Sequence, residues 1–430
     1  MSRAIAKIEF WTVCAVLVAP FLFPKAGQSQ ESIINALKQQ IAEMQEAMKK
    51  MAGRIEQLEK EKAATNTRVD QVERSAKTIQ SAPSALNPAI GMAIDATAEH
   101  RAATGGDFNF RAAEIGISAS IDPYARGYAF FTGSREGVEV EEAAMVTTSL
   151  PWNLQARGGR FFADFGRLAK FHPHEYAFVN TPLSLERMVG GESKADGVEL
   201  NYLFPTPFFL RATLGGYNKM GAENDRLDDT RSRSWSRFTY LGRLNTYFDL
   251  SDNHSLELGS SLAYTPSVRL ADAGGGNRSL SGVDLTYRYQ PAGSTLYQGF
   301  TWGSELFFNS ERRPFEIEAP SADHPDVLET QTASKRRFSV GGYTYGELKL
   351  NRNWSTGFLF DYAPSIDNPA KKTRSYSPFI TWNLSEFNRL RLQYSYFDDK
   401  VRAEKSERGN QIFLQWTTIL GAHSHGFRTR

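Results

Sequence analysis

In the stretch NRLRLQYSYF, residues 388–397, polar and apolar side chains alternate without a break from Arg389 to Tyr396. In an extended strand, Arg389, Arg391 and Gln393 therefore lie on one face, and the leucines and tyrosines between them lie on the other. The same alternation recurs after Pro88, most clearly in HSLELGSSLAY (254–264), WSTGFLFDY (354–362) and SYSPFITWNL (375–384). Segments of about ten alternating residues separated by turn signals predict transmembrane β-strands.

The lengths of the connections give a second indication. Short connections at 250–254, 350–354 and 384–388, and near Pro123, Pro151 and Pro205, alternate with longer polar ones at 218–237, 266–277, 310–335, 364–373 and 398–408. An outer-membrane barrel separates periplasmic turns from extracellular loops in this way, and a soluble β-sandwich has no reason to do so. We therefore expect an all-β transmembrane β-barrel of about 16 antiparallel strands over residues 88–427, with 428–430 as a C-terminal extension. A change of parity at Gly158 and Gly159 predicts a β-bulge.

Composition limits the other classes of protein. The 430 residues include 50 basic and 48 acidic ones, a formal net charge of +2, and the mean hydropathy is -0.43. These values exclude a bundle of transmembrane helices and give no general attraction to nucleic acid. The single cysteine, Cys14, allows no internal disulfide.

The first 87 residues differ from the rest. Residues 1–29 are predicted to be a secretory signal peptide, because Arg3 and Lys7 precede an apolar run at 10–23 that is short for a bilayer-spanning helix; an uncleaved anchor is the alternative. Residues 30–80 are predicted to form a periplasmic α-helical coiled coil, or alternatively one amphipathic helix packed on its own chain. Residues 81–87 would be a linker. The expected oligomerisation seam is Ile34, Leu37, Ile41, Met44, Met48, Met51, Ile55 and Leu58.

A barrel of about 16 strands leaves an aqueous lumen unless a segment fills it, so we expect a passive channel. Both signs of charge are expected on the lumen face, with at most a mild preference for anions. Residues 169–197 contain apolar side chains that an exposed loop would not need, so this connection is the best candidate to fold into the mouth. The expected pore-lining residues are Arg111, Arg157, Arg160, Arg211, Arg243, Arg288, Arg389, Arg391, Glu139, Glu141, Glu199, Glu257, Asp284, Glu347 and Asp361.

No catalytic or cofactor motif is present, so we expect neither enzymatic activity nor a cofactor. His172 and His174, beside Glu175, and the pair His423 and His425 are interpreted as surface loop residues, because two imidazoles without a thiol are a weak metal signal. The sequence therefore predicts no metal site.

Three stretches resemble a known family: NPAIGMAIDATAEH (87–100), GRFFADFGRLAKFHPHEYAFVNTPL (159–183) and FLQWTTILGAHSHGF (413–427). With the leader and the stalk, they resemble outer-membrane porins related to the phosphate-selective porin family, closest to the branch labelled zinc-regulated outer-membrane proteins. The resemblance covers nearly the whole chain. It implies a Gram-negative porin that is inserted by the outer-membrane assembly machinery.

We therefore expect an outer-membrane porin that passes small hydrophilic solutes or ions, with its coiled coil in the periplasm. Its expected partners are outer-membrane lipid, the assembly machinery, the transported solutes and two further copies of itself in a homotrimer, but no nucleic acid. The alternative is a barrel-anchored periplasmic tether or adhesion protein whose lumen is occluded.

Overall fold

The structure is a computed structural model that describes residues 39, 41–42, 45–46, 49–50, 53, 88–102, 104–221, 234–270, 273–291, 297–320, 328–366, 371–400 and 409–421. The chain divides into two units, 1–84 and 85–430. The predicted signal peptide, the linker and the C-terminal extension lie outside the described residues. Of the predicted coiled-coil seam only Ile41 is described; it is helical and half exposed, and the coiled coil stays a prediction.

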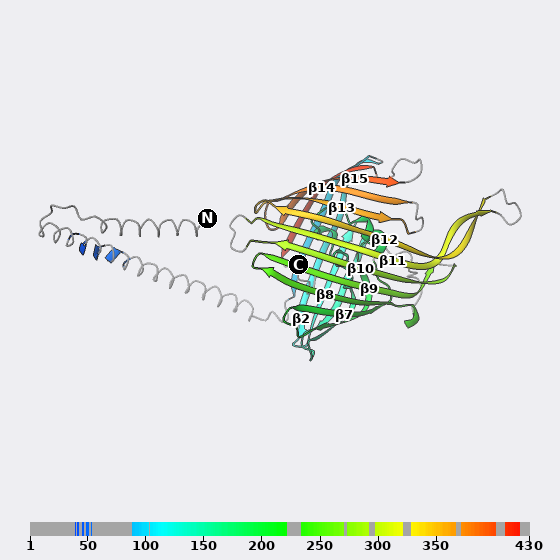
Figure 1. Cartoon of the computed structure of the whole chain (residues 1–430), viewed down its shortest axis with the longest axis horizontal. Coiled ribbons are helices and arrows are strands. Elements are labelled where there is room, and N and C mark those ends of the chain that lie inside the picture. Colours follow the sequence, from blue (N-terminus) through cyan, green and yellow to red (C-terminus); the bar gives the residue numbers. More distant parts are fainter. Residues whose placement is uncertain are drawn as a thin grey trace, which may run out of the picture. The chain divides into compact units, whose positions relative to one another are not determined.

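Sixteen antiparallel strands, all within the described residues, close into a barrel (Figure 1), which confirms the predicted barrel of about 16 antiparallel strands. The barrel closes where β1 pairs with β16, so neither the first nor the last strand is left as an open edge. Among the helices in the described part of the chain, none has the length and apolar character needed to cross a membrane. The strands are β1 (Ala89–Arg101), β2 (Gly105–Asp122), β3 (Ala125–Ser134), β4 (Gly137–Thr147), β5 (Leu154–Phe162), β6 (Lys194–Leu203), β7 (Phe209–Tyr217), β8 (Thr239–Ser251), β9 (His254–Leu270), β10 (Ala273–Tyr289), β11 (Gly299–Pro320), β12 (Leu328–Lys349), β13 (Trp354–Pro364), β14 (Lys372–Asn383), β15 (Asn388–Lys400) and β16 (Asn410–Gly421).

The two faces of β15 separate as the alternation predicted. Arg391 and Gln393 are buried inside the barrel, whereas Leu392 and Tyr394 on the outer face are 48% and 40% exposed. Because each backbone group pairs with a neighbouring strand, only the side chains have to match the surroundings on each side.

The loops expected at 266–277 and 310–335 are largely strand. β11 and β12 pair continuously from Gly299 and Lys349 to Pro320 and Leu328, and this hairpin extends beyond its neighbours (Figure 1). These segments were interpreted as loops because 266–277 contains three consecutive glycines and 310–335 is rich in charged residues and proline. The connections at 102–104 and 135–136 are also short, so long and short connections do not alternate strictly.

Side chains stabilise the tight turns at the end of the barrel opposite the tip of the β11–β12 hairpin. Between β2 and β3, Asp122 Oδ1 accepts hydrogen bonds from the backbone N–H groups of Tyr124 and Ala125, at 2.7 and 2.8 Å. Between β12 and β13, Asn351 Oδ1 accepts from the N–H groups of Asn353 and Trp354, both at 2.9 Å. Asp and Asn favour turns for this reason.

The expected bulge at Gly158 and Gly159 is not present in the pairing of β5 with β6, which runs without a register shift. Gly159 instead has a φ of 131°, and a Cβ there would lie 2.3 Å from the Ala143 carbonyl oxygen, so this position requires glycine. The parity change in the sequence thus reflects a close approach of β4 to β5.

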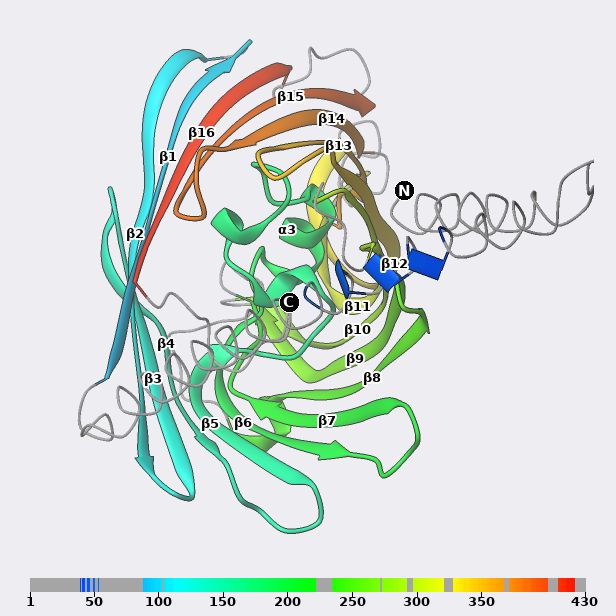
Figure 2. The same cartoon turned by 90° about the vertical axis from the view of Figure 1, so that its left-hand side faces the viewer.

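Residues 163–193, which connect β5 to β6, lie inside the barrel; we call this segment the lumen loop. Figure 2 shows it within the ring of strands, including the short helix α3 (Leu183–Val189). The 3₁₀ helices η3 (Leu168–Lys170) and η4 (Pro173–Glu175) precede α3, and a third, η5 (Trp235–Arg237), precedes β8. The loop therefore starts and ends slightly before the expected 169–197.

Candidate functional site

The lumen loop crosses to the far wall of the barrel and packs there through aromatic side chains. Phe178 is fully buried, with its ring centroid 5.3 Å from that of Tyr345 and 6.3 Å from that of Phe379. Phe165 stacks on Phe307 at 6.3 Å. The apolar residues of the loop therefore form one core with β11, β12 and β14.

Polar side chains of the wall satisfy backbone groups of the lumen loop. The Val179 N–H donates to Gln393 Oε1 at 2.6 Å, and the carbonyls of Val179 and Phe178 accept from Arg111 and Arg391 at 3.0 and 3.1 Å. At α3, the Ser184 N–H lies 3.3 Å from both carboxylate oxygens of Asp361. An irregular segment can be buried only when its backbone groups find such partners.

Three cavities lined by residues that the structure describes border the lumen loop. The largest, which we call the β5–β10 cavity, has a volume of about 440 Å³ and lies between residues 162–171 and the wall. Its charged lining is dominated by ion pairs: Arg157 contacts Glu199 at 2.5 Å, and Arg167 contacts Glu257 at 2.7 Å. Arg288 approaches the same Glu257 oxygen at 3.5 Å, so one carboxylate serves two guanidinium groups.

Asp164 of the lumen loop is surrounded by cations in the β5–β10 cavity. Lys170, Arg211 and Arg243 lie 2.5, 2.8 and 3.6 Å from its carboxylate oxygens. Burial alone would raise the pKa of Asp164, but these three charges lower it well below its ordinary value. Lys170 and Arg211 line the cavity with this single carboxylate, so the cavity keeps excess positive charge.

The β12–β15 cavity has a volume of about 310 Å³ and lies on the other side of Arg167 and Phe171. Arg389 and Arg391 contribute to its lining. The guanidinium of Arg391 is buried, and its hydrogen-bond acceptors are neutral: the Phe178 carbonyl, the Thr381 hydroxyl and the Gln415 amide oxygen, at 3.1, 2.9 and 3.2 Å. A buried cation with neutral partners adds a positive field to the cavity.

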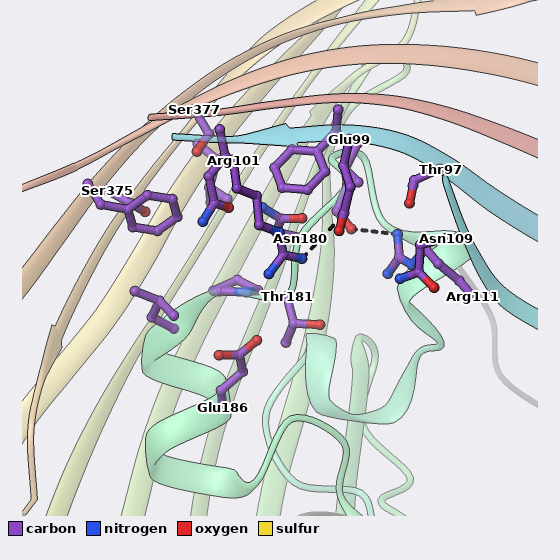
Figure 3. A pocket seen from close by; sticks show the side chains of 17 residues that line it. Thr97, Glu99, Arg101, Asn109, Arg111, Asn180, Thr181, Glu186, Ser375 and Ser377 are labelled. Atoms are coloured by element: carbon purple, nitrogen blue, oxygen red, sulfur yellow. Dashed lines mark hydrogen bonds and ion pairs between the residues drawn. The ribbon is translucent and has the colours of Figure 1, made fainter. Parts of the chain in front are cut away.

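The third cavity, which we call the β1–β2 cavity, has a volume of about 240 Å³ (Figure 3). Asn180, Thr181 and Glu186 of the lumen loop face Glu99 and Arg111 of the wall across it. Arg111 also lies 3.4 Å from Asp95, so both signs of charge line this side of the loop.

His172 and His174 are not surface residues, contrary to our interpretation of the sequence, because their exposed fractions are only 2% and 4%. Nδ1 of His172 lies 3.2 Å from a carboxylate oxygen of Glu114 and 3.4 Å from one of Glu141. Burial opposes protonation, but Glu141 and Glu114 raise the pKa of His172 to about 10. We call Glu114, Glu141, His172 and the nearby Glu192 the histidine cluster. His423 and His425 lie outside the described residues.

Most of the expected pore-lining residues contribute to these interior sites. Arg243 pairs with Asp284 at 2.6 Å inside the wall. Arg160 does not face the lumen. Because β5 has no bulge in its pairing with β6, Arg160 lies on the outer face of the barrel, as the exposed Val198 does, and pairs there with Asp196 at 2.6 Å. The remaining positions are Arg157, Arg211, Arg288, Glu199 and Glu257 at the β5–β10 cavity; Arg389, Arg391 and Glu347 at the β12–β15 cavity; Arg111 at the β1–β2 cavity; Asp361 below α3; Glu141 in the histidine cluster; and Glu139, largely exposed and paired with Lys194.

Sequence reasoning missed the charged residues that the lumen loop itself carries into the barrel. Asp164, Arg167 and Lys170 line the β5–β10 cavity, and Glu192 joins the histidine cluster. Asp164, Arg167 and Lys170 recur at every third position of FADFGRLAK (162–170), but most of this stretch precedes the connection that was expected to enter the mouth, 169–197.

No protein-family model matches the chain. A protein of Aquifex aeolicus (strain VF5), described as an uncharacterized protein, is 32% identical over 347 residues, which cover 74% of this chain and 70% of the relative. Among solved structures, the anion-selective porin from Comamonas acidovorans has a TM-score of 0.51 at 10% identity, covering 78% of this chain and 99% of the porin. The trimer form of OmpT, an outer membrane protein of Vibrio cholerae, has a TM-score of 0.50 at 10% identity, covering 77% and 99%. The chain therefore belongs to the same family as the Aquifex aeolicus protein, with a barrel fold that resembles outer-membrane porins.

Proposed function

We propose that this protein is an outer-membrane porin that lets small hydrophilic solutes or ions diffuse passively, with a mild preference for anions. The observation that carries the proposal is the lumen loop, which leaves charged cavities on its two sides inside a closed barrel. Basic residues exceed acidic ones by five to three around the β5–β10 cavity and by four to two around the β12–β15 cavity. Such an excess concentrates anions near the constriction.

The proposal includes the cellular setting. The protein would lie in the outer membrane, with its predicted coiled coil in the periplasm, and would have no enzymatic activity. We propose a homotrimer joined partly by that coiled coil; the trimer form of the similar V. cholerae OmpT supports this assembly. The finer relation to phosphate-selective porins rests on the sequence resemblance.

One observation favours the alternative, a barrel-anchored tether with an occluded lumen. The aromatic core that joins the lumen loop to the far wall is closed to solvent, because the side chains of Phe165, Phe178 and Phe307 are fully buried. A loop held this firmly could close the barrel if it did not move. Conductance separates the two functions.

The test is single-channel recording of the refolded full chain in a planar bilayer, followed by the reversal potential in a salt gradient. A porin gives stable open conductance steps, in groups of three for a trimer. With the proposed preference, the sign of its reversal potential shows that anions pass more readily than cations. Arg288→Gln should shift that potential toward cation selectivity. The control is Arg352→Gln, which removes an equally charged but exposed side chain from a short turn. A folded barrel that never conducts would exclude the porin function.

Deleting residues 30–81 tests the role of the predicted stalk. A porin without the stalk still conducts, although its trimer should dissociate more easily, whereas a tether loses its effect on the cell envelope. Conductance that disappears while the barrel remains folded would contradict this expectation.

A further inference from the structure

The histidine cluster joins the lumen loop to the wall on the side opposite Phe178. Glu114 belongs to β2, Glu141 to β4, and His172 and Glu192 to the lumen loop. Nδ1 of His172 lies 3.2, 3.4 and 3.9 Å from carboxylate oxygens of Glu114, Glu141 and Glu192. Glu114, Glu141 and His172 are each at least 95% buried. Residues far apart in the sequence thus bring their ligand atoms to one small buried volume.

The charges in this cluster do not balance through these contacts alone. Three carboxylates approach the same imidazole nitrogen; a proton on His172 can neutralise one of them, and the Lys194 ammonium, which acts on Glu141 and Glu192, a second. Burying unbalanced carboxylates is costly unless another cation or additional protons accompany them. A divalent cation supplies two positive charges and removes the proton from Nδ1 at the same time.

The distances fit coordination by a small metal ion. Two N or O atoms bound to one tetrahedral Zn²⁺ at about 2.0–2.2 Å lie about 3.3–3.6 Å apart. The separations from His172 Nδ1 to Glu114 and Glu141, 3.2 and 3.4 Å, need only small adjustments to match. One ligand atom of each of these three residues lies within 4.8 Å of the other two. One imidazole with carboxylates is a donor set suited to Zn²⁺ and to related divalent transition metals.

We propose that Glu114, Glu141 and His172 bind one divalent transition-metal ion, with Zn²⁺ as the best match, and that Glu192 or water completes the coordination. The ion would link the lumen loop to β2 and β4. Together with the aromatic contacts of Phe178 on the far wall, it would hold the loop on both sides of the lumen. This site goes beyond the proposed porin function and does not depend on it.

The histidine ring is already positioned for this role. The Phe162 ring lies 4.8 Å from the His172 ring, and the His174 ring stacks on it at 5.5 Å, which limits its rotation. Thr132 donates a hydrogen bond to Glu141 on its other oxygen, Oε2, and leaves Oε1 directed to His172. Such outer contacts orient metal ligands before the ion arrives.

The experiment measures metal binding by the refolded, chelator-treated full chain in detergent, with isothermal titration of Zn²⁺ and with Mg²⁺ as a second titrant. We expect one Zn²⁺ per protomer and no comparable binding of Mg²⁺. Glu141→Gln and His172→Gln should each weaken Zn²⁺ binding by at least about tenfold, because even partners outside the first shell contribute 10- to 100-fold. Co²⁺ should give the visible absorption bands of a tetrahedral site in the wild type and lose them in both variants.

The matched control is Asp361→Asn, which alters another buried acidic contact of the same loop, at Ser184, and should leave the Zn²⁺ affinity unchanged. Heat-modifiable migration on a gel verifies that each variant is a folded barrel; Glu141→Gln keeps the shape of the side chain if His172→Gln fails to fold. Wild-type protein that binds no Zn²⁺, or variants that bind it as tightly as the wild type, would overturn the proposal. Because titration does not involve conductance, this result is independent of the porin test.

Discussion

Replacing Phe178 with alanine removes the main aromatic contact between the lumen loop and the far wall. The side chain is fully buried between Tyr176, Tyr345 and Phe379, with ring centroids 5.6, 5.3 and 6.3 Å away. The substitution leaves a cavity where the phenyl ring was. No strand-to-strand hydrogen bond passes through this side chain, so the barrel wall keeps its pairing.

The magnitude follows from the burial. A buried Phe→Ala change costs about 3–5 kcal/mol. If this cost falls on the docked state of the loop, at least about 3 kcal/mol shifts its docking equilibrium by roughly 100-fold, because 1.4 kcal/mol corresponds to a factor of ten. The side chains of Arg391 and Gln393 still form hydrogen bonds with the backbone of the lumen loop at residues 178 and 179. We therefore expect the loop to leave the wall often but briefly, and not to be released permanently.

Single-channel recording measures the consequence. We expect Phe178→Ala to show a larger mean conductance and more frequent transitions than the wild type. Phe358→Ala is the control, because it makes the same chemical change on the outer face, where Phe358 is 45% exposed. If folded Phe178→Ala gives traces indistinguishable from those of Phe358→Ala, the loop does not control the pore and our reasoning is refuted.

Three further predictions concern the wall. Arg243→Met leaves the Asp284 carboxylate without its buried partner and removes one of the three cations around Asp164, so it should lower the free energy of unfolding in detergent by about 3–5 kcal/mol, measured with urea; an unchanged midpoint would show that the Arg243–Asp284 pair contributes nothing. Gly197→Ala places a Cβ 2.2 Å from the Gly216 carbonyl oxygen, so it should lower the free energy of unfolding by about 1–3 kcal/mol and reduce the refolding yield. In the control, Gly158→Ala, the nearest atom lies 3.6 Å from the new Cβ, and the protein should refold normally. Equal refolding yields of the two variants would contradict this expectation. Arg391→Gln removes a buried charge whose acceptors are neutral, so the reversal potential should move toward cations. Relief from burying the charge offsets the hydrogen bond lost to the Phe178 carbonyl, so the unfolding midpoint should change little; a large loss of stability would mean that this hydrogen bond to the loop outweighs the cost of burying the charge.

The fold was predictable because one face of most strands is apolar. In residues 388–397 the alternation placed Arg391 and Gln393 inside and Leu392 outside, as the structure shows. The hairpin of β11 and β12 was missed because its extended part is rich in charged residues and proline, which favour loops. The position of Arg160 was predicted wrongly because the glycine pair at 158–159 has two explanations: a β-bulge, or a close approach of β4 that requires glycine at position 159.

The candidate site was less predictable because it is assembled from distant parts of the chain. The apolar residues of the lumen loop indicated that it enters the barrel. The burial of His172 could not be inferred, since Glu114 and Glu141 approach it from strands 58 and 31 residues earlier, as the difference in residue numbers shows. Histidine is intermediate between the buried and the exposed residue types, so its type does not decide its burial, and only the three-dimensional structure identifies its partners.

The seam between β1 and β16 determines the order in which the molecule can assemble. Asp95 in the first strand accepts hydrogen bonds from Gln415 and Thr417 in the last, at 2.9 and 2.8 Å, across 320 and 322 residues of chain. Likewise, the Val179 N–H of the lumen loop can donate its hydrogen bond only after Gln393, 214 residues later, is in place. Contacts of such sequence separation form late and slowly. The growing sheet therefore keeps two unpaired borders until its last strand arrives, and a chain that lost β16 would remain an open, association-prone sheet.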